Sequence, residues 1–384
     1  MRTALAALTL VGVIALSVGS APAAQSACPY QGQLFIYGQN GWDTITNALA
    51  ANQTPCVQYY VVLTAITDKT VPRGRRAIDF VHAKGSNFHA LAEFNWTAWS
   101  KAAPANSNWY AKGVTFRRRM ASAGYNPALG DSWAVNELSS AVRTKVAART
   151  KARDALRGLF RGPRGGPPMM GAAFVIGATQ RQTNLAPYKA QTESWLADAA
   201  FWSTVTQSVA WWGQEAYTRC SSVCVGSAKV AVRSSHVNDF VEHPAKLAFA
   251  GPAPTLAARG LFDRSYFPLM TAYWKDAKGY GDNRISLEAM QKLVSLEVYA
   301  ARAWAGRYPY PDGRIGFAWN EHPAGVTPAA VQALATRLAQ AIQGAYGDAG
   351  TAGKACGSPT TYILCKAAVR GAAFNEGWKA FESW

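Results

Sequence analysis

The sequence predicts an α/β protein built as a (β/α)8 TIM barrel, with a helical insertion in its second half. Strand-like and helix-like segments alternate over the first part of the chain, a pattern typical of parallel strands joined by helices. Residues 57–64 form a continuous apolar run, as expected for a strand that is buried on both faces. An open nucleotide-binding sheet is the alternative, but no glycine-rich phosphate loop follows the first strand. About eight strand–helix units fit the 384 residues, which favours the barrel.

Six strands and the helices between them follow in order along the first part of the chain. Strands are expected where short apolar runs stop at turn residues, and helices where apolar residues recur at helical spacing. The expected strands are 34–38, 57–64, 88–94, 133–135, 169–176 and 209–212, and the expected helices are 42–51, 75–84, 109–123, 141–160 and 195–206. The apolar residues of the helix at 141–160 include Val142, Val146, Leu156 and Phe160, and the basic stretch at 143–164 is expected to be its solvated face.

The second half of the chain has a different pattern. Residues 228–306 are expected to be mostly helical and to form the insertion, although 266–273 fits either a seventh strand or a helix. Residues 315–319 form the last expected strand. Thr327 followed by Pro328 predicts the start of a final helix, because a capping residue before a proline is typical of a helix start. The expected inward stripe of this helix is Val331, Leu334, Leu338 and Ile342.

The beginning of the chain has the features of a secretion signal. Arg2 supplies the positive start, residues 4–18 are apolar, and Ala21-Pro22-Ala23 supplies small residues for cleavage. Residues 1–23 are therefore expected to be removed, leaving one barrel domain at 24–350 and a disulfide-tied tail at 351–384. The apolar run is too short for a comfortable membrane span. A secreted protein without stable membrane insertion is expected, either extracellular or associated with the cell wall.

The cysteines and the charge favour an exported protein that meets anionic surfaces. The six cysteines fall in local pairs, and disulfides form in oxidising compartments. The pairs favoured by proximity are Cys28–Cys56, Cys220–Cys224 and Cys356–Cys365. Zinc is the alternative for the middle pair, but no second pair or histidine follows at ligand spacing. The net charge of +17 favours anionic partners. Nucleic-acid binding is not expected, because aromatic residues are not interleaved with the cations of the basic stretch.

Three strand-like runs end in an amide followed by a glutamate. They end at Asn136-Glu137, Gln214-Glu215 and Asn320-Glu321, in a chain with only 16% charged residues. The carboxyl ends of barrel strands carry the active site of such folds, so these glutamates are expected to face a common site. Glu93, near the end of the third strand, is expected to line it. Cleavage of a glycosidic bond needs two carboxyl groups that face each other across the bond, and it needs no metal or other cofactor.

The run Trp133-Ala134-Val135-Asn136-Glu137 resembles the Asn-Glu signature of the clan A (β/α)8-barrel glycoside hydrolases. The resemblance implies that Glu137 is the acid/base and that Asn136 binds the 2-hydroxyl group of a sugar. The run Phe317-Ala318-Trp319 is similar to the eighth-strand tryptophan that forms the floor of the sugar site in that clan. The nucleophile of the clan lies at the end of strand seven, whereas Glu215 falls on the sixth expected strand. Glu215 is favoured as the second carboxylate, with Glu321 as its competitor.

The sequence therefore predicts a secreted, monomeric glycoside hydrolase that acts on a poly- or oligosaccharide, with retention of configuration. A non-catalytic carbohydrate- or wall-binding protein on the same barrel is the alternative. No His-Glu-x-x-His and no Gly-x-Ser-x-Gly motif occurs, so neither a zinc protease nor an α/β-hydrolase is indicated. Besides Asn136, amides and aromatic rings near the strand ends are expected to contact the sugar. They are Asn95, Trp96, Trp99, Trp212, Gln214, Tyr217, Trp319 and Asn320.

Overall fold

The computed structural model describes most of the first half of the chain and selected segments of the second. The described residues are 32–37, 42–53, 57–63, 71–138, 140–175, 195, 197–217, 224–225, 231–232, 266–272, 316–319, 327, 329–330, 332–334 and 336–337. The expected signal segment and C-terminal tail lie outside these ranges. So does at least one cysteine of every expected disulfide. Secretion, cleavage and disulfide pairing therefore stay predictions.

The fold is mixed α/β, and its best-described part is a parallel half-barrel of six strands. These strands are β1 (Gly32–Tyr37), β2 (Val57–Leu63), β3 (Phe88–Asn95), β4 (Ser132–Leu138), β5 (Gly171–Val175) and β6 (Val209–Tyr217). Each pairs in parallel with the next one along the chain. The six strands expected from the apolar runs are confirmed, with boundaries that differ by a few residues.

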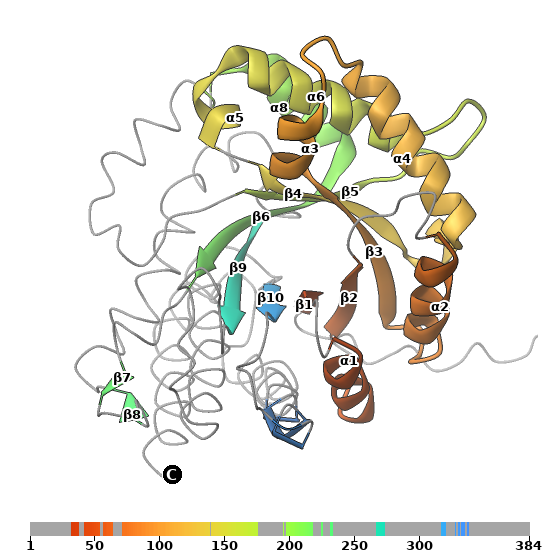
Figure 1. Cartoon of the computed structure of the whole chain (residues 1–384), viewed down its shortest axis with the longest axis vertical. Helices are drawn as coiled ribbons and strands as arrows, with labels where there is room; N and C mark the ends of the chain where they lie inside the picture. The colour runs from red at the N-terminus through yellow and green to blue at the C-terminus, as the bar shows by residue number, and fades with distance from the viewer. Residues whose placement is uncertain are drawn as a thin grey trace, which may run out of the picture.

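Two further strands continue the sheet beyond β6. The strand β9 (Tyr266–Ala272) pairs in parallel with β6 and with β10 (Gly316–Trp319), and β10 pairs with β1, so the ring of pairings closes (Figure 1). Residues 266–272 are thus a strand, which decides between the two possibilities left open by the sequence. A separate antiparallel pair is formed by β7 (Cys224–Val225) and β8 (Ala231–Val232). Within the expected insertion at 228–306, the structure describes the strands β8 and β9.

Helices follow the strands of the first half and cover the outside of the sheet. They are α1 (Trp42–Ala51), α2 (Val71–His82), α3 (Trp96–Ala102), α4 (Trp109–Ala123), the short 3-10 helix η1 (Pro127–Leu129), α5 (Ser140–Thr144), α6 (Val146–Arg161) and α8 (Ala199–Ser208). Figure 1 shows α4, α6 and α8 on the outer side of β3 to β5. Asn108 caps the start of α4, since its side chain accepts a hydrogen bond from the Ala111 N–H. Gly124 caps the end of α4 in the left-handed conformation.

The expected single helix at 141–160 is in fact two helices. Lys145 has extended backbone angles, φ −120° and ψ 120°, so α5 ends before this residue and α6 begins after it. Val146, expected among the inward apolar residues, is consequently 65% exposed. Small residues and leucines form the buried face of α6 instead. They include Ala152, Ala155, Leu156, Gly158 and Leu159.

The basic stretch is only partly a solvated face. The Arg157 side chain is 53% exposed, as expected. Arg149 is 4% exposed, and its Nε donates to Asp198 Oδ2 over 2.9 Å. Since Asp198 also caps α8 through the Phe201 N–H, this ion pair connects α6 to the start of α8.

The core of the barrel is built from alternate residues of neighbouring strands. Side chains that face inward form one buried cluster, and Trp211 packs against it. The cluster consists of Phe35, Tyr60, Val62, Leu91, Ala134, Ala172 and Phe174. In the described part of the final helix, Leu334 is fully buried and Thr327 accepts a hydrogen bond from the Ala330 N–H, as expected. None of the described helices is long and apolar enough to cross a membrane.

Candidate functional site

The parallel register of β3 and β4 brings polar side chains together at the carboxyl ends of these strands. Glu93 lies opposite Ala134, and Asn95 lies opposite Asn136. Leu91 and Ala134 belong to the buried cluster inside the barrel. Because side chains alternate along a strand, residues two positions further on each strand face the same interior. Glu93 and Asn136 are therefore set at the mouth of the barrel, above its apolar core.

A hydrogen-bonded chain links Glu93 to Glu137 through Asn136. The Asn136 Nδ2 donates to Glu93 Oε1 over 2.9 Å. At the other end of the same amide, Asn136 Oδ1 accepts from the Glu137 N–H over 2.8 Å. Since the amide nitrogen faces a carboxyl and the amide oxygen faces an N–H, only one orientation of the Asn136 side chain satisfies both partners. Glu93 therefore fixes the orientation of the amide that precedes Glu137.

Glu93 is a buried carboxyl group whose charged form is disfavoured by its surroundings. It is 5% exposed, and burial raises its pKa because it disfavours the charged state. Hydrogen bonds from Asn136 and Asn95 oppose this effect, and the charge of Glu137 adds to it. The carboxyl groups of Glu93 and Glu137 are thus close enough to influence each other. They differ in environment, because Glu137 is half-buried.

Glu137 has a backbone conformation that is unusual for its residue type. Its φ of 55° lies in the left-handed region, and it is the only non-glycine residue of the described chain with a positive φ. Two contacts hold it there: the Asn136 side chain accepts its N–H, and Thr97 Oγ1 donates to its carbonyl over 3.1 Å. The pairing of β4 with β5 also shifts in register between Val135 and Leu138. Left-handed residues and bulges are concentrated at functional sites, where they direct a side chain away from the regular strand.

Asn95, expected to bind a sugar, is already engaged at the junction of β3 and α3. Its Oδ1 accepts from the Ala98 N–H over 2.7 Å, which caps α3, and its side chain also donates to Glu93. Both ends of this amide are occupied within the protein. The structure therefore favours a structural role for Asn95 over direct contact with a ligand.

Two tryptophans expected to stack on a sugar are buried in the outer layer of the fold. Trp96 is 2% exposed and lies 4.8 Å from the Trp109 ring centroid. Trp212 is 1% exposed and packs against Trp195 and Trp202, with centroids 5.4 Å and 5.2 Å away. Neither Trp96 nor Trp212 presents a ring face to a ligand, so the structure argues against both expectations.

The tryptophan that faces the barrel interior is the neighbour of Trp212. Trp211 lies 4.7 Å from Tyr60 and 6.2 Å from Phe35, between ring centroids. Adjacent residues of a strand face opposite sides, and the sequence Trp-Trp does not say which of the two faces inward. The register of β6 against β5 decides it, because Trp211 pairs with the inward-facing Ala172.

The other expected site residues lie on β6 and at or beyond the end of β10. Gln214, Glu215 and Tyr217 belong to β6, and Glu215 pairs with Leu269 of β9. Trp319 is the last residue of β10. The side chains of these four residues, and all of Asn320 and Glu321, lie outside the described part of the structure. Glu215 is on the sixth strand, as expected, and its catalytic role remains a prediction.

A second polar cluster lies at the opposite end of β3 and β4. Asp131 is 3% exposed and accepts the N–H groups of Ala90 and Asn126, both over 2.8 Å. Its carboxylate also contacts His82 Nε2 at 3.0 Å. The amino ends of barrel strands contribute to stability and not to catalysis. These groups are therefore part of the framework, and no described group of three His, Cys, Asp or Glu residues is arranged to hold a metal ion.

No protein-family model and no curated protein matches this sequence. Among solved structures, the chain is similar to the endo-β-N-acetylglucosaminidase from Cordyceps militaris in its apo form. That similarity has a TM-score of 0.37 and 9% identity, and covers 80% of this chain and 91% of the other. A structure from a study of the pneumococcal virulence factor StrH and of N-glycan recognition and hydrolysis has a TM-score of 0.20 and 9% identity, over 89% of this chain and 98% of the other. Both similarities are too distant to assign an activity, so the function is inferred from the residues at the strand ends.

Proposed function

We propose that this protein is a secreted glycoside hydrolase on a complete (β/α)8 barrel, with Glu137 as its acid/base. The observation that carries the proposal is the position of Asn136 and Glu137 at the carboxyl end of β4, beside the carboxyl of Glu93. Glycosidic bonds are cleaved when a positioned carboxylic acid protonates the leaving oxygen. Glu137 is half-buried, so it has both access to a substrate and a partly desolvated environment.

Glu93 has a supporting role in this proposal. A carboxyl that is 5% exposed cannot readily reach a glycosidic oxygen, but it does bond the amide that holds the Glu137 backbone. We therefore assign Glu93 as a positioning residue that acts through Asn136.

A second carboxylate is required opposite Glu137. Glu215 on β6 is the favoured candidate, as nucleophile in a retaining reaction, and Glu321 after β10 is the competitor. A separation of about 5 Å between the two carboxyl groups predicts retention, whereas about 6.5–9.5 Å predicts inversion. The proposal includes cleavage of the signal segment after Ala23, the three local disulfides and a monomeric state.

The test is hydrolysis of a panel of plant, fungal and actinobacterial wall polysaccharides by the purified protein, measured as new reducing ends. Loss of a general acid costs about 10²- to 10⁴-fold in rate, so Glu137→Gln should be at least about a hundredfold slower and still bind. Asp79→Asn, on the exposed surface of α2, makes the same change of charge and should have no effect. Binding by the wild-type protein without any turnover would contradict the proposal and support a carbohydrate-binding protein instead.

Further variants assign the remaining roles. Glu93→Gln keeps an oxygen that can accept from Asn136 Nδ2, so it should retain far more activity than Glu93→Ala. Equal losses in these two variants would show that the bond to Asn136 is not what matters. If Glu215→Gln remains active while Glu321→Gln is inactive, Glu321 is the second carboxylate. The anomer released first, identified by NMR, distinguishes retention from inversion.

A further inference from the structure

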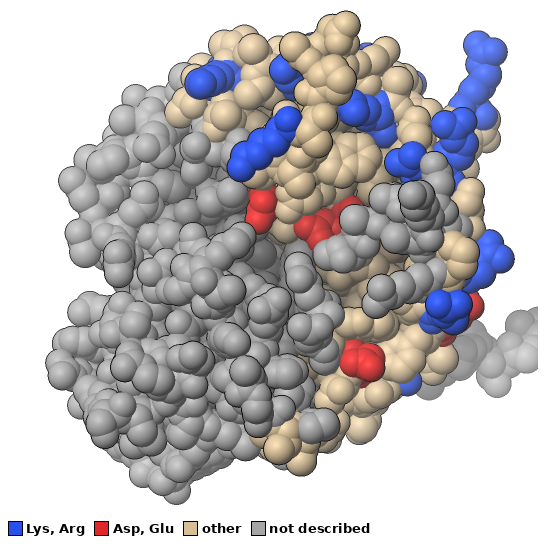
Figure 2. All heavy atoms as spheres, in the orientation of Figure 1, with Lys and Arg blue, Asp and Glu red and all other residues tan. Residues whose placement is uncertain are grey.

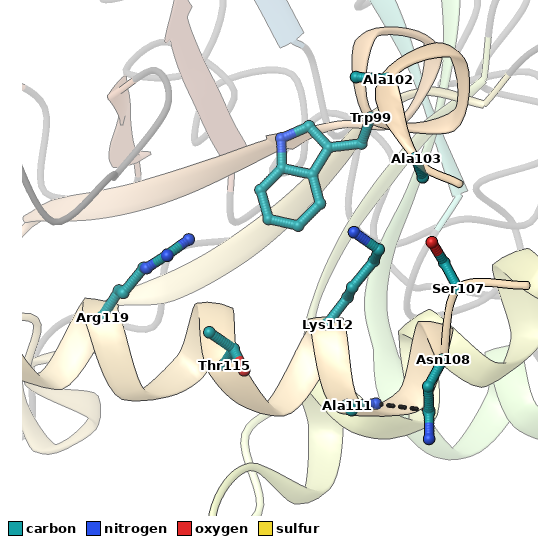
Figure 3. A pocket seen from close by; sticks show the side chains of 9 residues that line it. All are labelled: Trp99, Ala102, Ala103, Ser107, Asn108, Ala111, Lys112, Thr115 and Arg119. Carbon is teal, nitrogen blue, oxygen red and sulfur yellow. Dashed lines mark hydrogen bonds between the residues drawn. The ribbon is translucent and has the colours of Figure 1, made fainter.

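A pocket of about 440 Å³ lies between α3 and α4, apart from the carboxyl groups of the strand ends. Figure 3 shows Trp99 on α3 facing across it toward Lys112, Thr115 and Arg119 on α4. The remaining lining residues are Ala102 and Ala103 at the end of α3, the loop residue Ser107, and Asn108 and Ala111 at the start of α4. The α4 residues recur at three- to four-residue intervals, so they form one face of that helix.

The indole of Trp99 forms a fixed, half-exposed platform in this pocket. Its ring centroid lies 4.0 Å from that of Phe94 and 5.8 Å from that of Phe116, so packing against the buried layer holds it in place. Phe94 and Phe116 are both fully buried. A fixed, half-exposed aromatic ring is suited to stack on the C–H face of a pyranose ring.

The pocket is positively charged. Lys112 Nζ is held between two rings, 5.8 Å from the Trp99 centroid and 5.6 Å from the Trp109 centroid. Arg119 supplies a second cation, and none of the described residues that line the pocket is acidic. The first turn of α4 carries no acidic residue either, so its positive end is not neutralised there. Figure 2 shows the same imbalance on a larger scale, with Lys and Arg side chains spread over the described helices on this face and few acids among them.

We propose that this pocket binds an acidic sugar unit of a polysaccharide. The indole would stack on the sugar ring, the hydroxyl group of Ser107 would bond one of its hydroxyls, and Lys112 would pair with its anionic group. A carboxylate, as in a uronic acid, and a phosphate, as in a sugar phosphate, share this chemistry. The proposal concerns binding alone and does not depend on the proposed hydrolysis.

The test is calorimetric titration of the full chain with trigalacturonate, with neutral galactotriose of the same linkage and with glucose 6-phosphate. We expect trigalacturonate to bind at least about tenfold more tightly than galactotriose, because one charge-assisted hydrogen bond is worth about that factor. Lys112→Gln should abolish most of this preference, and Lys112→Arg should keep it. Lys101→Gln is the matched control, since Lys101 is exposed on α3 and does not line the pocket.

The titrations distinguish a carboxylate ligand from a phosphate ligand, and specific binding from unspecific attraction. Binding of glucose 6-phosphate without binding of trigalacturonate supports the anionic site and identifies phosphate as its ligand group. Equal binding of the neutral and acidic trisaccharides overturns the proposal. If Lys101→Gln loses as much of the preference for the acidic trisaccharide as Lys112→Gln does, the attraction is unspecific and the proposal is also overturned. Absence of binding by every probe up to about 10 mM overturns it as well. Trp99→Phe, which keeps an aromatic ring against Phe94, should weaken the binding of acidic and neutral sugars by the same factor.

Discussion

The crossing of α4 and α6 depends on two glycines that allow the helix backbones to touch. A Cβ built on Gly158 of α6 would lie 2.1 Å from the Tyr110 carbonyl oxygen, and one built on Gly113 of α4 would lie 2.5 Å from the Ala155 carbonyl oxygen. Real Cβ contacts are essentially never closer than 3.0 Å. In Gly158→Ala the helices must therefore separate by about 0.9 Å at this point, the difference between 3.0 Å and 2.1 Å.

The cost of this separation follows from packing. Overfilling a packed interface costs about 1–3 kcal/mol, occasionally more, and here the obstructing atoms are backbone, which cannot change rotamer. Replacement of a helical glycine by alanine returns about 1 kcal/mol of helix propensity. We expect Gly158→Ala to lower the free energy of unfolding by up to about 2 kcal/mol, the upper cost of about 3 kcal/mol less the propensity gain of about 1 kcal/mol. Gly113→Ala should lower it by less, because its closest contact is 2.5 Å and not 2.1 Å. Because α4 carries one wall of the pocket, the change should also weaken binding there.

Gly74→Ala on α2 is the matched control. A Cβ at Gly74 would lie 3.8 Å from Ala123 Cβ, which is an ordinary contact, so this variant should gain about 0.5–1 kcal/mol of stability. The assay is urea unfolding followed by tryptophan fluorescence, with the midpoint compared among the variants. A Gly158→Ala protein that unfolds at the wild-type midpoint, while Gly74→Ala is stabilised, would refute the close crossing of α4 and α6.

Two further predictions concern buried carboxyl groups. Burial raises the pKa of Glu93, so wild-type stability should fall as pH rises from about 4.3, the usual value for Glu, through the folded-state pKa. Glu93→Gln should be more stable than wild type at neutral pH and lose this advantage near pH 4, as measured by urea unfolding at several pH values. A stability difference between the two proteins that does not change with pH would contradict the raised pKa of Glu93. Asp131→Ala leaves the N–H groups of Ala90 and Asn126 without their acceptor and should cost about 3 kcal/mol or more, whereas the exposed Asp79→Ala should change stability by less than about 0.5 kcal/mol. Similar midpoints for both alanine variants would show that Asp131 does not support the barrel.

Much of the strand order could be predicted from the sequence. Continuous apolar runs such as 57–64 and 209–212 are typical of strands in a sheet that is covered on both faces. In the structure they form β2 and part of β6. The position of Asn136 and Glu137 at the end of β4 was also predicted, because the run ends where polar residues begin. The local pattern of the segment 266–272 fits either a strand or a helix, and its pairing with β6 and β10 determines that it is a strand.

The candidate site depends on contacts that the sequence pattern does not specify. The sequence places Glu93 near a strand end, where it is expected to line the site, but the structure shows it as the buried partner of Asn136, which lies 43 residues away in sequence. Trp96 and Trp212 were chosen for their positions near strand ends, but helix packing places their rings on the outer side of the sheet. The break at Lys145 was missed because the apolar spacing continues through it.

The alternation of strands and helices, and the glutamate that follows an asparagine at the end of the fourth strand, can be read from the sequence alone. These features depend on residues close together in the chain, whose spacing sets which face of an element is apolar. Three features emerge from the folded chain alone: Glu93 is buried beside Asn136, Trp211 and not Trp212 faces inward, and α3 and α4 enclose a basic pocket around Trp99. Burial, pKa and pocket shape depend on the register between strands and on the close approach of helices, and both bring together residues that are far apart in the chain.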